Sequence, residues 1–286
     1  MAISINTNTA ALSAGNKINR TSEALTNSIN RLSTGLRIVR PGDDPAGNQI
    51  ADTLRADAQI AQTAILNGNS AFSFTSIADA SLSGVSSLLT RMAELAEQSA
   101  NGVFANSQRS ALSNEFQALG SEIQRIAKST EFNGLSLLSN SSSVSIQIGL
   151  DGSELSRITL EAVTGTLDSL GLAAAGSDAL TFSILGTTEA GAIDASQNAL
   201  DAVKGALSSL NATRGNIGAT ESRLSTAIEG LTTIREEFIS AESRIRDLDV
   251  AAETAELVRL QVLQQAQSAV LGQANQLPSI ALSLLG

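Results

Sequence analysis

Apolar residues recur every seven positions over the last third of the chain. One row runs from Leu210 to Ala252, and a second row, from Ala227 to Val262, interleaves with it in alternating steps of three and four. This is the pattern of a coiled-coil seam, and no proline interrupts it. A helix with such a seam cannot bury it alone. The pattern therefore predicts a long helix, beginning near Ile193, that packs along another helix.

Three earlier segments show the same helical period. The first runs from Ile18 to Leu36. The second starts at Asp43-Asp44-Pro45, where an aspartate cap precedes a proline at the first helical position, and runs to about Ala100. The third carries the apolar positions of Leu112–Ile126. These spacings predict three further helices in the first half of the chain.

The apolar period changes to two in the middle of the chain. Val144, Ile146 and Ile148 alternate with polar residues, Asp151-Gly152 is a turn signal, and Ile158–Ala162 forms the returning segment. A second short strand is predicted at Thr181–Leu185. This part of the chain should therefore form small β-hairpins.

These patterns predict a mainly α fold: a long antiparallel coiled-coil rod formed by the N- and C-terminal segments, with a small β-hairpin region at about 140–190. We expect two domains. Residues 1–42 and 250–286 would form a terminal coiled-coil domain, and residues 43–249 a rod domain with the long helices and the hairpins.

Composition excludes several classes of function but says less about the fold. The 286 residues include seven Phe but no Tyr or Trp, so the core must be aliphatic. The net charge of −10 disfavours binding to nucleic acids or to anionic membranes. There is no Cys and no His, which excludes disulfides, thiol nucleophiles and histidine-based catalytic triads. We expect neither enzymatic activity nor a cofactor or metal, and Asp43-Asp44 is better explained as a helix cap than as a metal site.

Several motifs near both ends are similar to those of bacterial flagellins. The N-terminal half has Ile5–Leu12 (INTNTAAL), Ser28–Ile38 (SINRLSTGLRI) and Glu94–Gly102 (ELAEQSANG). The C-terminal half has Ser243–Asp249 (SRIRDLD) and Gln273–Gln276 (QANQ). The chain resembles a minimal flagellin that lacks the large variable central domains. Pro45 stands where the family usually has Ala, a change that a helix start accepts.

The resemblance implies a structural subunit that self-assembles into the flagellar filament used for swimming. It also implies export to the bacterial exterior without a cleaved signal peptide. The expected partners are copies of the chain itself, a flagellar secretion chaperone, the filament cap and the hook-junction proteins. Two alternatives remain open: a hook–filament junction protein, which has similar termini, and a coiled-coil adhesin or scaffold that works as a fixed small oligomer.

Two sets of residues follow from the resemblance. The first set would form the subunit-assembly surface of the terminal helices: Ile18, Leu25, Ile29, Leu32, Leu36, Leu263, Val270, Leu277, Leu284 and Leu285. The second set matches positions through which similar flagellins bind Toll-like receptor 5: Arg91, Leu95 and Glu115. A simpler interpretation is open for each set, namely an intramolecular helix pair for the first and an ordinary surface ion pair for the second.

Overall fold

A computed structural model describes residues 7–285 of the chain, and the side chains of residues 7–276. The chain divides into two compact units. The terminal unit comprises Met1–Ala58 with Glu236–Gly286, and the central unit comprises Gln59–Arg235. The terminal unit thus reaches further into the chain than the limits expected from the sequence, 1–42 and 250–286.

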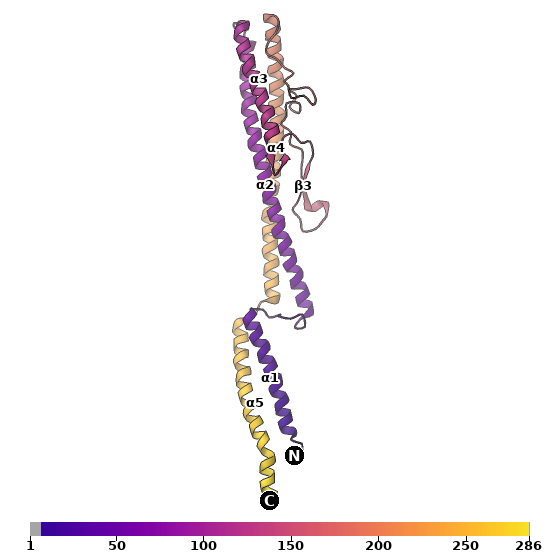
Figure 1. The fold of residues 1–286 in the computed structure, drawn as a ribbon, viewed down its shortest axis with the longest axis vertical. Helices are drawn as coiled ribbons and strands as arrows, with labels where there is room; N and C mark the ends of the chain where they lie inside the picture. The colour runs from indigo at the N-terminus through magenta and orange to yellow at the C-terminus, as the bar shows by residue number, and fades with distance from the viewer. Residues whose placement is uncertain (1–6, 286) are drawn as a thin grey trace. The chain divides into compact units, whose positions relative to one another are not determined.

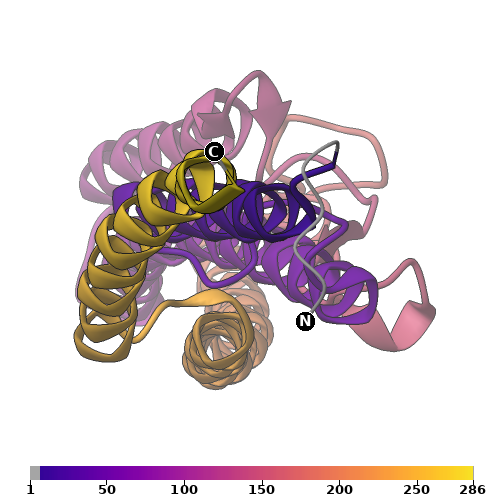
Figure 2. The same ribbon diagram turned by 90° about the horizontal axis from the view of Figure 1, so that it is seen from below.

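The terminal unit is built around a pair of helices. Helices α1 (Thr9–Thr34) and α5 (Val250–Leu285) lie side by side and run in opposite directions (Figures 1 and 2). Asn8 at the start of α1 donates a side-chain hydrogen bond to the carbonyl of Ala274 near the end of α5, 2.8 Å away. The unit also contains the first turns of α2 (Pro45–Ala100) and the last turns of α4 (Glu189–Arg246).

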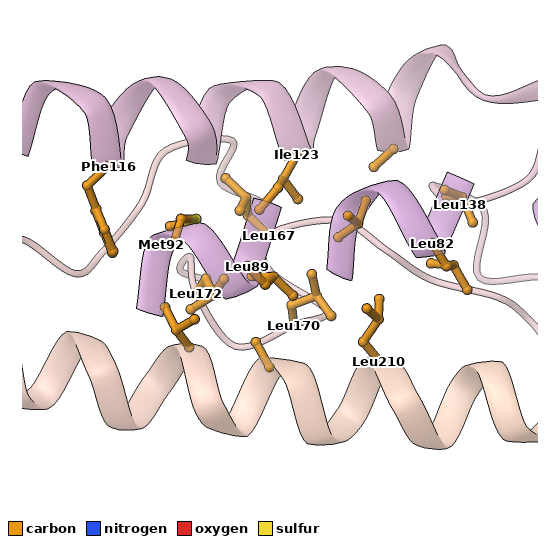
Figure 3. Close-up of a cluster of buried hydrophobic side chains, with 14 of the residues drawn as sticks. Leu82, Leu89, Met92, Phe116, Ile123, Leu138, Leu167, Leu170, Leu172 and Leu210 are labelled. Carbon is orange, nitrogen blue, oxygen red and sulfur yellow. The ribbon is translucent and has the colours of Figure 1, made fainter. Parts of the chain in front are cut away.

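The central unit holds the main hydrophobic core. It lies between α2, α3 (Asn106–Ser129), α4 and the irregular segment that precedes α4. Leu82, Leu89, Phe116 and Leu210 point from the three helices toward one another, and Leu172 fills the space from the irregular segment (Figure 3). All five side chains are fully buried. The core is aliphatic apart from Phe116 and Met92, as the composition predicted.

Two short antiparallel hairpins follow α3. Strands β1 (Glu131–Phe132) and β2 (Leu135–Ser136) flank Asn133 and Gly134, which both have positive φ, 51° and 77°. A two-residue turn of this kind matches the twist of the flanking strands. Strands β3 (Val144–Gln147) and β4 (Arg157–Leu160) pair in register from Val144↔Leu160 to Gln147↔Arg157, with the 3₁₀ turn Glu154–Ser156 before β4.

The mainly α fold with long paired helices and small hairpins is confirmed, and two details differ from the prediction. Residues Thr181–Leu185 form no strand. The long C-terminal helix is interrupted after Arg246, and α5 begins at Val250. The predicted seam is buried from Leu210 to Leu231 but is exposed at Ala252, beyond the interruption. The helix phase changes there, so one continuous seam does not exist.

Candidate assembly surfaces

The face of α1 that meets α5 follows steps of three and four. Ala14, Thr21 and Ser28 are buried, and Ile18 and Leu25 are half-buried between them, as is the more distal Leu32. Steps of this kind keep one stripe of a helix against its partner. Small hydroxyl side chains at two of the three buried positions make this seam more polar than a usual coiled-coil core.

The matching face of α5 carries Leu260, Leu263, Leu271 and Ala274, which are buried or half-buried. Between them Gln264 donates its amide Nε2–H to the Ser22 hydroxyl of α1, 3.1 Å away. The Gln267 carbonyl oxygen Oε1 is buried and has no hydrogen-bond partner among the described residues. The pair is therefore held by a mixture of leucine contacts and amide or hydroxyl groups.

A second side of α5, away from and beside the seam, is apolar but uncovered. Val258, Val262 and Val270 are 57%, 58% and 56% exposed. Exposed alanines extend this stripe: Ala251, Ala255, Ala266 and Ala269. A helix that is apolar beyond the stripe that meets its partner cannot bury all of its apolar side chains against α1. We call these seven residues the outer stripe of α5.

The predicted assembly residues fall in three places. Ile18, Leu25, Leu32 and Leu263 lie in or beside the intramolecular seam, and Leu36 lies in the connection after α1. Ile29 and Val270 are exposed instead, 50% and 56%. Leu277, Leu284 and Leu285 lie outside the side chains that the structure describes.

The connections beside the helix pair are joined to each other. Leu36, after α1, forms an isolated antiparallel bridge with Asp247, after α4. The Arg37 N–H donates to the Arg246 carbonyl at 2.7 Å, and the Leu248 N–H donates to the Gly35 carbonyl at 3.0 Å. Gly35 ends α1 with φ 71°, a left-handed conformation that favours glycine. We call this pairing the clasp. No local sequence signal predicted it.

An ion-pair network lies next to the clasp. Arg246 Nη1 is 3.2 Å from Asp52 Oδ1 and 3.9 Å from Glu242 Oε1, and Arg55 Nε is 3.3 Å from the same Glu242 oxygen. The Arg246 and Glu242 side chains are mostly buried, at 16% and 17% exposed. Charges that are largely removed from water need such partners. The network fixes the end of α4 against the start of α2.

Of the two aspartates before α2, Asp44 caps the helix, as predicted, whereas Asp43 binds the loop that precedes it. Asp44 Oδ1 accepts a hydrogen bond from the Gly47 N–H at 2.9 Å. Asp43 Oδ2 accepts from the N–H groups of Arg40 and Val39, at 3.0 and 3.1 Å. These two backbone hydrogen bonds favour the ionised carboxylate and lower the pKa of Asp43.

Arg91 and Glu115 meet on the surface of the central unit. Arg91 Nε donates to Glu115 Oε1 at 2.9 Å, and Arg91 Nη1 donates to Glu94 Oε2 at 3.0 Å. The pKa of Arg91 is raised by these hydrogen bonds, first to Glu94 and then to Glu115. All three side chains are about half exposed, so the group is available to a partner.

Leu95 is not part of that surface. Its side chain is 0% exposed and belongs to the central core. The position lies on the same stripe of α2 as Leu82, Leu89 and Met92, each of which is buried. A side chain enclosed by the core cannot touch a partner in this conformation, so the prediction for Leu95 as a contact residue is wrong for this structure.

Arg109 is a buried cation that the sequence analysis missed. Its side chain is fully buried, and its Nε and Nη2 donate to the carbonyls of Ser99 and Asn101, at 3.0 and 3.1 Å. These carbonyls lie at the C-terminal end of α2, where a positive charge is favourable. Nearby, the Ser196 hydroxyl donates to Ser99 Oγ at 3.0 Å. Arg109 therefore has a structural role at the end of α2.

The part of the chain that the structure describes holds no group of three or more metal-ligating side chains. None of the helices in that part is long and apolar enough to cross a membrane.

Family comparisons cover most of the chain. Residues 5–143 match the bacterial flagellin N-terminal helical region, and residues 200–285 match the bacterial flagellin C-terminal helical region. A flagellin of Halalkalibacterium halodurans is 36% identical over 258 residues, with 90% of each chain covered. Flagellin B of Vibrio cholerae is 29% identical, with 100% of each chain covered.

A solved structure supports the fold alone. A Vibrio parahaemolyticus protein assigned as flagellar hook-associated superposes with a TM-score of 0.58 at 14% identity. The superposition covers 72% of this chain and 100% of that chain.

The long paired helices and the uncovered apolar side of α5 are typical of a structural protein that associates through helices. The sequence matches make the assignment specific: the chain belongs to the bacterial flagellin family. It is a structural subunit of the flagellar filament, which lies outside the cell and serves motility. The flagellin match decides against the two alternatives, a junction protein and an adhesin or scaffold. Flagellins are structural proteins, which fits the absence of catalytic motifs.

Proposed function

We propose that the terminal unit forms the inner core of the filament and that the outer stripe of α5 packs against neighbouring subunits. The observation that carries this proposal is the exposure of Val258, Val262 and Val270 on the face of α5 that α1 does not cover. Identical subunits that join through non-identical patches form an open helical polymer. In such a polymer every copy would bury its outer stripe, together with exposed Ile29 on α1.

The predicted residues then divide by role. Ile18, Leu25, Leu32 and Leu263 hold α1 against α5 and present the outer stripe, whereas Ile29 and Val270 contact the next subunit. Leu36 orders the clasp. Leu277, Leu284 and Leu285 continue the apolar sequence to the end of the chain and would extend the same core.

Assembly of purified protein tests this proposal. We expect V258D/V262D to abolish growth from wild-type seeds, because two carboxylates would be buried in an apolar contact. The matched control is Q261D/S268D, which adds the same charge to exposed polar positions on another side of α5. Electron microscopy and light scattering would follow growth. Filaments from V258D/V262D at the wild-type rate would contradict the proposal.

The uncovered outer stripe also supports the proposed partners before and during assembly. An exposed apolar helix face is a site of aggregation or of partner binding. We propose that a flagellar secretion chaperone binds α5 and covers this face before export. By family resemblance, we also propose that the chain is exported without a cleaved signal peptide. The filament would then grow beneath the filament cap and attach to the hook-junction proteins. Co-purification of the chaperone with wild-type protein, and its loss with V258D/V262D, tests the first step.

A second candidate function is recognition by Toll-like receptor 5 through the Arg91–Glu115 group. The supporting observation is the exposed, hydrogen-bonded arrangement of Arg91, Glu94 and Glu115 across α2 and α3. We expect R91A and E115A to weaken the response of a receptor reporter assay to monomeric protein. The control is R125A, which removes another exposed ion pair of α3, with Glu122. An equal response to all variants would contradict this proposal.

A further inference from the structure

The charges of this chain are distributed unevenly. Residues 1–42 hold five of the 18 cationic side chains and only one of the 28 carboxylates, a net charge of +4. The rest of the chain carries a net charge of −14. A strongly acidic molecule thus begins with a basic segment, and most of that segment is helix α1.

Three of the cations share one side of α1. At 100° per residue, Lys17, Arg20 and Arg31 fall within about 60° of one another around the helix axis. Lys17 and Arg20 are exposed and Arg31 is half-buried. They flank the seam that packs on α5 without belonging to it. We call these three residues the basic stripe.

The basic stripe has no direct counter-charge within the subunit. Among the residues that the structure describes, no ion pair or side-chain hydrogen bond joins Lys17, Arg20 or Arg31 to a carboxylate. The charge of Arg31 only contributes, after two backbone hydrogen bonds, to lowering the pKa of Asp43. By contrast, nearby Arg246, Arg55 and Arg259 each have a carboxylate within 4 Å.

We propose that the basic stripe binds the acidic surface of a neighbouring copy of this chain and directs the docking of α1 during filament growth. This rests on the proposed assembly function. Charge complementarity selects the occupant: a second copy offers a surface of net charge −14 outside its own basic segment. Its exposed carboxylates without an ion pair in the described residues include Asp194, Asp201 and Glu229.

A phosphate-bearing surface fits these observations less well. Nucleic acid or anionic lipid would attract the basic stripe but would be repelled by the rest of the chain. Membrane-surface helices also insert a continuous apolar face. The apolar seam of α1 is already covered by α5, and the large exposed apolar side chains in the described part of α1 are Leu12 and Ile29, far apart along the helix.

Neutralising the basic stripe tests the inference. We expect K17Q/R20Q/R31Q to lengthen wild-type seeds about tenfold more slowly at low salt, because electrostatic guidance of docking is lost. Glutamine preserves helix propensity, and circular dichroism would confirm it. The matched control, K204Q/R223Q/R235Q, changes the net charge equally and removes three cations of α4 that have no ion pair in the described residues. At about 0.5 M NaCl the difference between the triples should disappear.

Three results would overturn the inference. If both triple variants slow filament growth equally, the effect comes from net charge alone. If neither variant slows growth, the basic stripe has no role in docking. Normal growth of K17Q/R20Q/R31Q with loss of binding to phosphatidylglycerol vesicles would assign the basic stripe to lipid. V258D/V262D in the same assay separates the two proposals, because its normal growth contradicts the assembly function itself.

Discussion

Arg214 of α4 and Asp79 of α2 form a two-point ion pair within the central unit. Arg214 Nε is 2.8 Å from Asp79 Oδ1, and Nη2 is 3.2 Å from Oδ2. The hydrogen bonds to Asp79 raise the pKa of Arg214. Both side chains are about one-third exposed, so water weakens the attraction without cancelling it. The pair links the two longest helices at a fixed register.

Asp79→Asn should lower the free energy of unfolding of the monomer by about 1 kcal/mol, an amount already reduced for solvent screening. Urea unfolding followed by circular dichroism would measure it. A double-mutant cycle with Arg214→Met should give a coupling of about 0.5–1 kcal/mol. Additive effects of the two changes would mean that the pair contributes nothing.

The close approach of α2 and α4 at Gly68 gives a second prediction. A Cβ at this position would lie 2.8 Å from Cγ1 of Ile228. Gly68→Ala should therefore cost about 1 kcal/mol or more despite its better helix propensity, because Ile228 must move. The added change Ile228→Ala should remove the clash.

Gly84 is the matched control for Gly68. It lies in the same helix, but a Cβ there meets no atom within 4 Å. Gly84→Ala should stabilise the monomer by about 0.5–1 kcal/mol, the usual gain for Ala over Gly in a helix. If both substitutions stabilise equally in urea unfolding, the close packing at Gly68 is not limiting.

Arg109 should matter far more than exposed arginines. Arg109→Ala leaves the buried carbonyl of Ser99 and the partly buried carbonyl of Asn101 without their donor, so we expect a loss of about 2–3 kcal/mol. Arg125→Ala, which breaks an exposed pair with Glu122, should change stability much less. Thermal and urea unfolding of both variants would compare them. Similar losses would contradict the structural role of Arg109.

The lowered pKa of Asp168 predicts a specific dependence of stability on pH. Its carboxylate accepts hydrogen bonds from the Thr166 hydroxyl and from the N–H groups of Gly176 and Ser169, which lower its pKa below 3.8. Because the folded pKa is the lower one, the stabilisation is complete above pH 3.8 and is lost as the pH falls through the folded pKa.

Asp168→Asn should therefore destabilise the protein at neutral pH, and the difference from wild type should shrink as acid is added. The exposed Asp201, which makes no hydrogen bond among the described side chains, supplies the control D201N. Unfolding curves at about pH 7 and about pH 2.5 suffice. A difference between wild type and D168N that grows in acid would contradict the assignment.

Much of the fold follows from local sequence. The Asp44 cap before α2 and the hairpin of β3 and β4 were predicted from turn residues and periodicity. Local signals succeed there because the residues that decide each element lie within a few positions of it. The core was also predicted in part, since Leu210, Ile217 and Leu224 are buried as expected.

The interruption between α4 and α5 falls at the domain limit expected from the sequence, between residues 249 and 250, but glycine and proline signals do not mark it. Residues 243–252 contain neither glycine nor proline, and their apolar period continues without change. The helix ends because Asp247 and Leu248 pair with Leu36 and Gly35, some 210 positions away in the chain. A tertiary contact thus overrides a favourable local pattern, and it shifts the phase of every residue in α5.

The site residues show the same limit. Residues spaced exactly seven apart drift by about 20° per repeat around a straight helix. Ile29 and Val270 are therefore exposed outside the seam, whereas Leu32 and Leu263 are half-buried in or beside it. Leu95 was expected as a contact residue only from the resemblance to flagellins, yet its side chain is 0% exposed and belongs to the core. Arg109 gave no signal, since nothing local distinguishes a buried arginine from an exposed one.

The polar character of the α1–α5 seam has a thermal consequence. Ser28 Oγ and Gln267 Oε1 of the helix pair are buried without a hydrogen-bond partner in the described residues, as are Arg109 Nη1 and Ser113 Oγ of the central unit, but only the central unit offsets this with the large aliphatic cluster of the described core. Stability within one chain can differ between such parts. Calorimetry of the monomer should show two transitions, the helix pair melting first. Between the two temperatures the molecule keeps a native centre while its ends are unpaired and open to exchange with another copy.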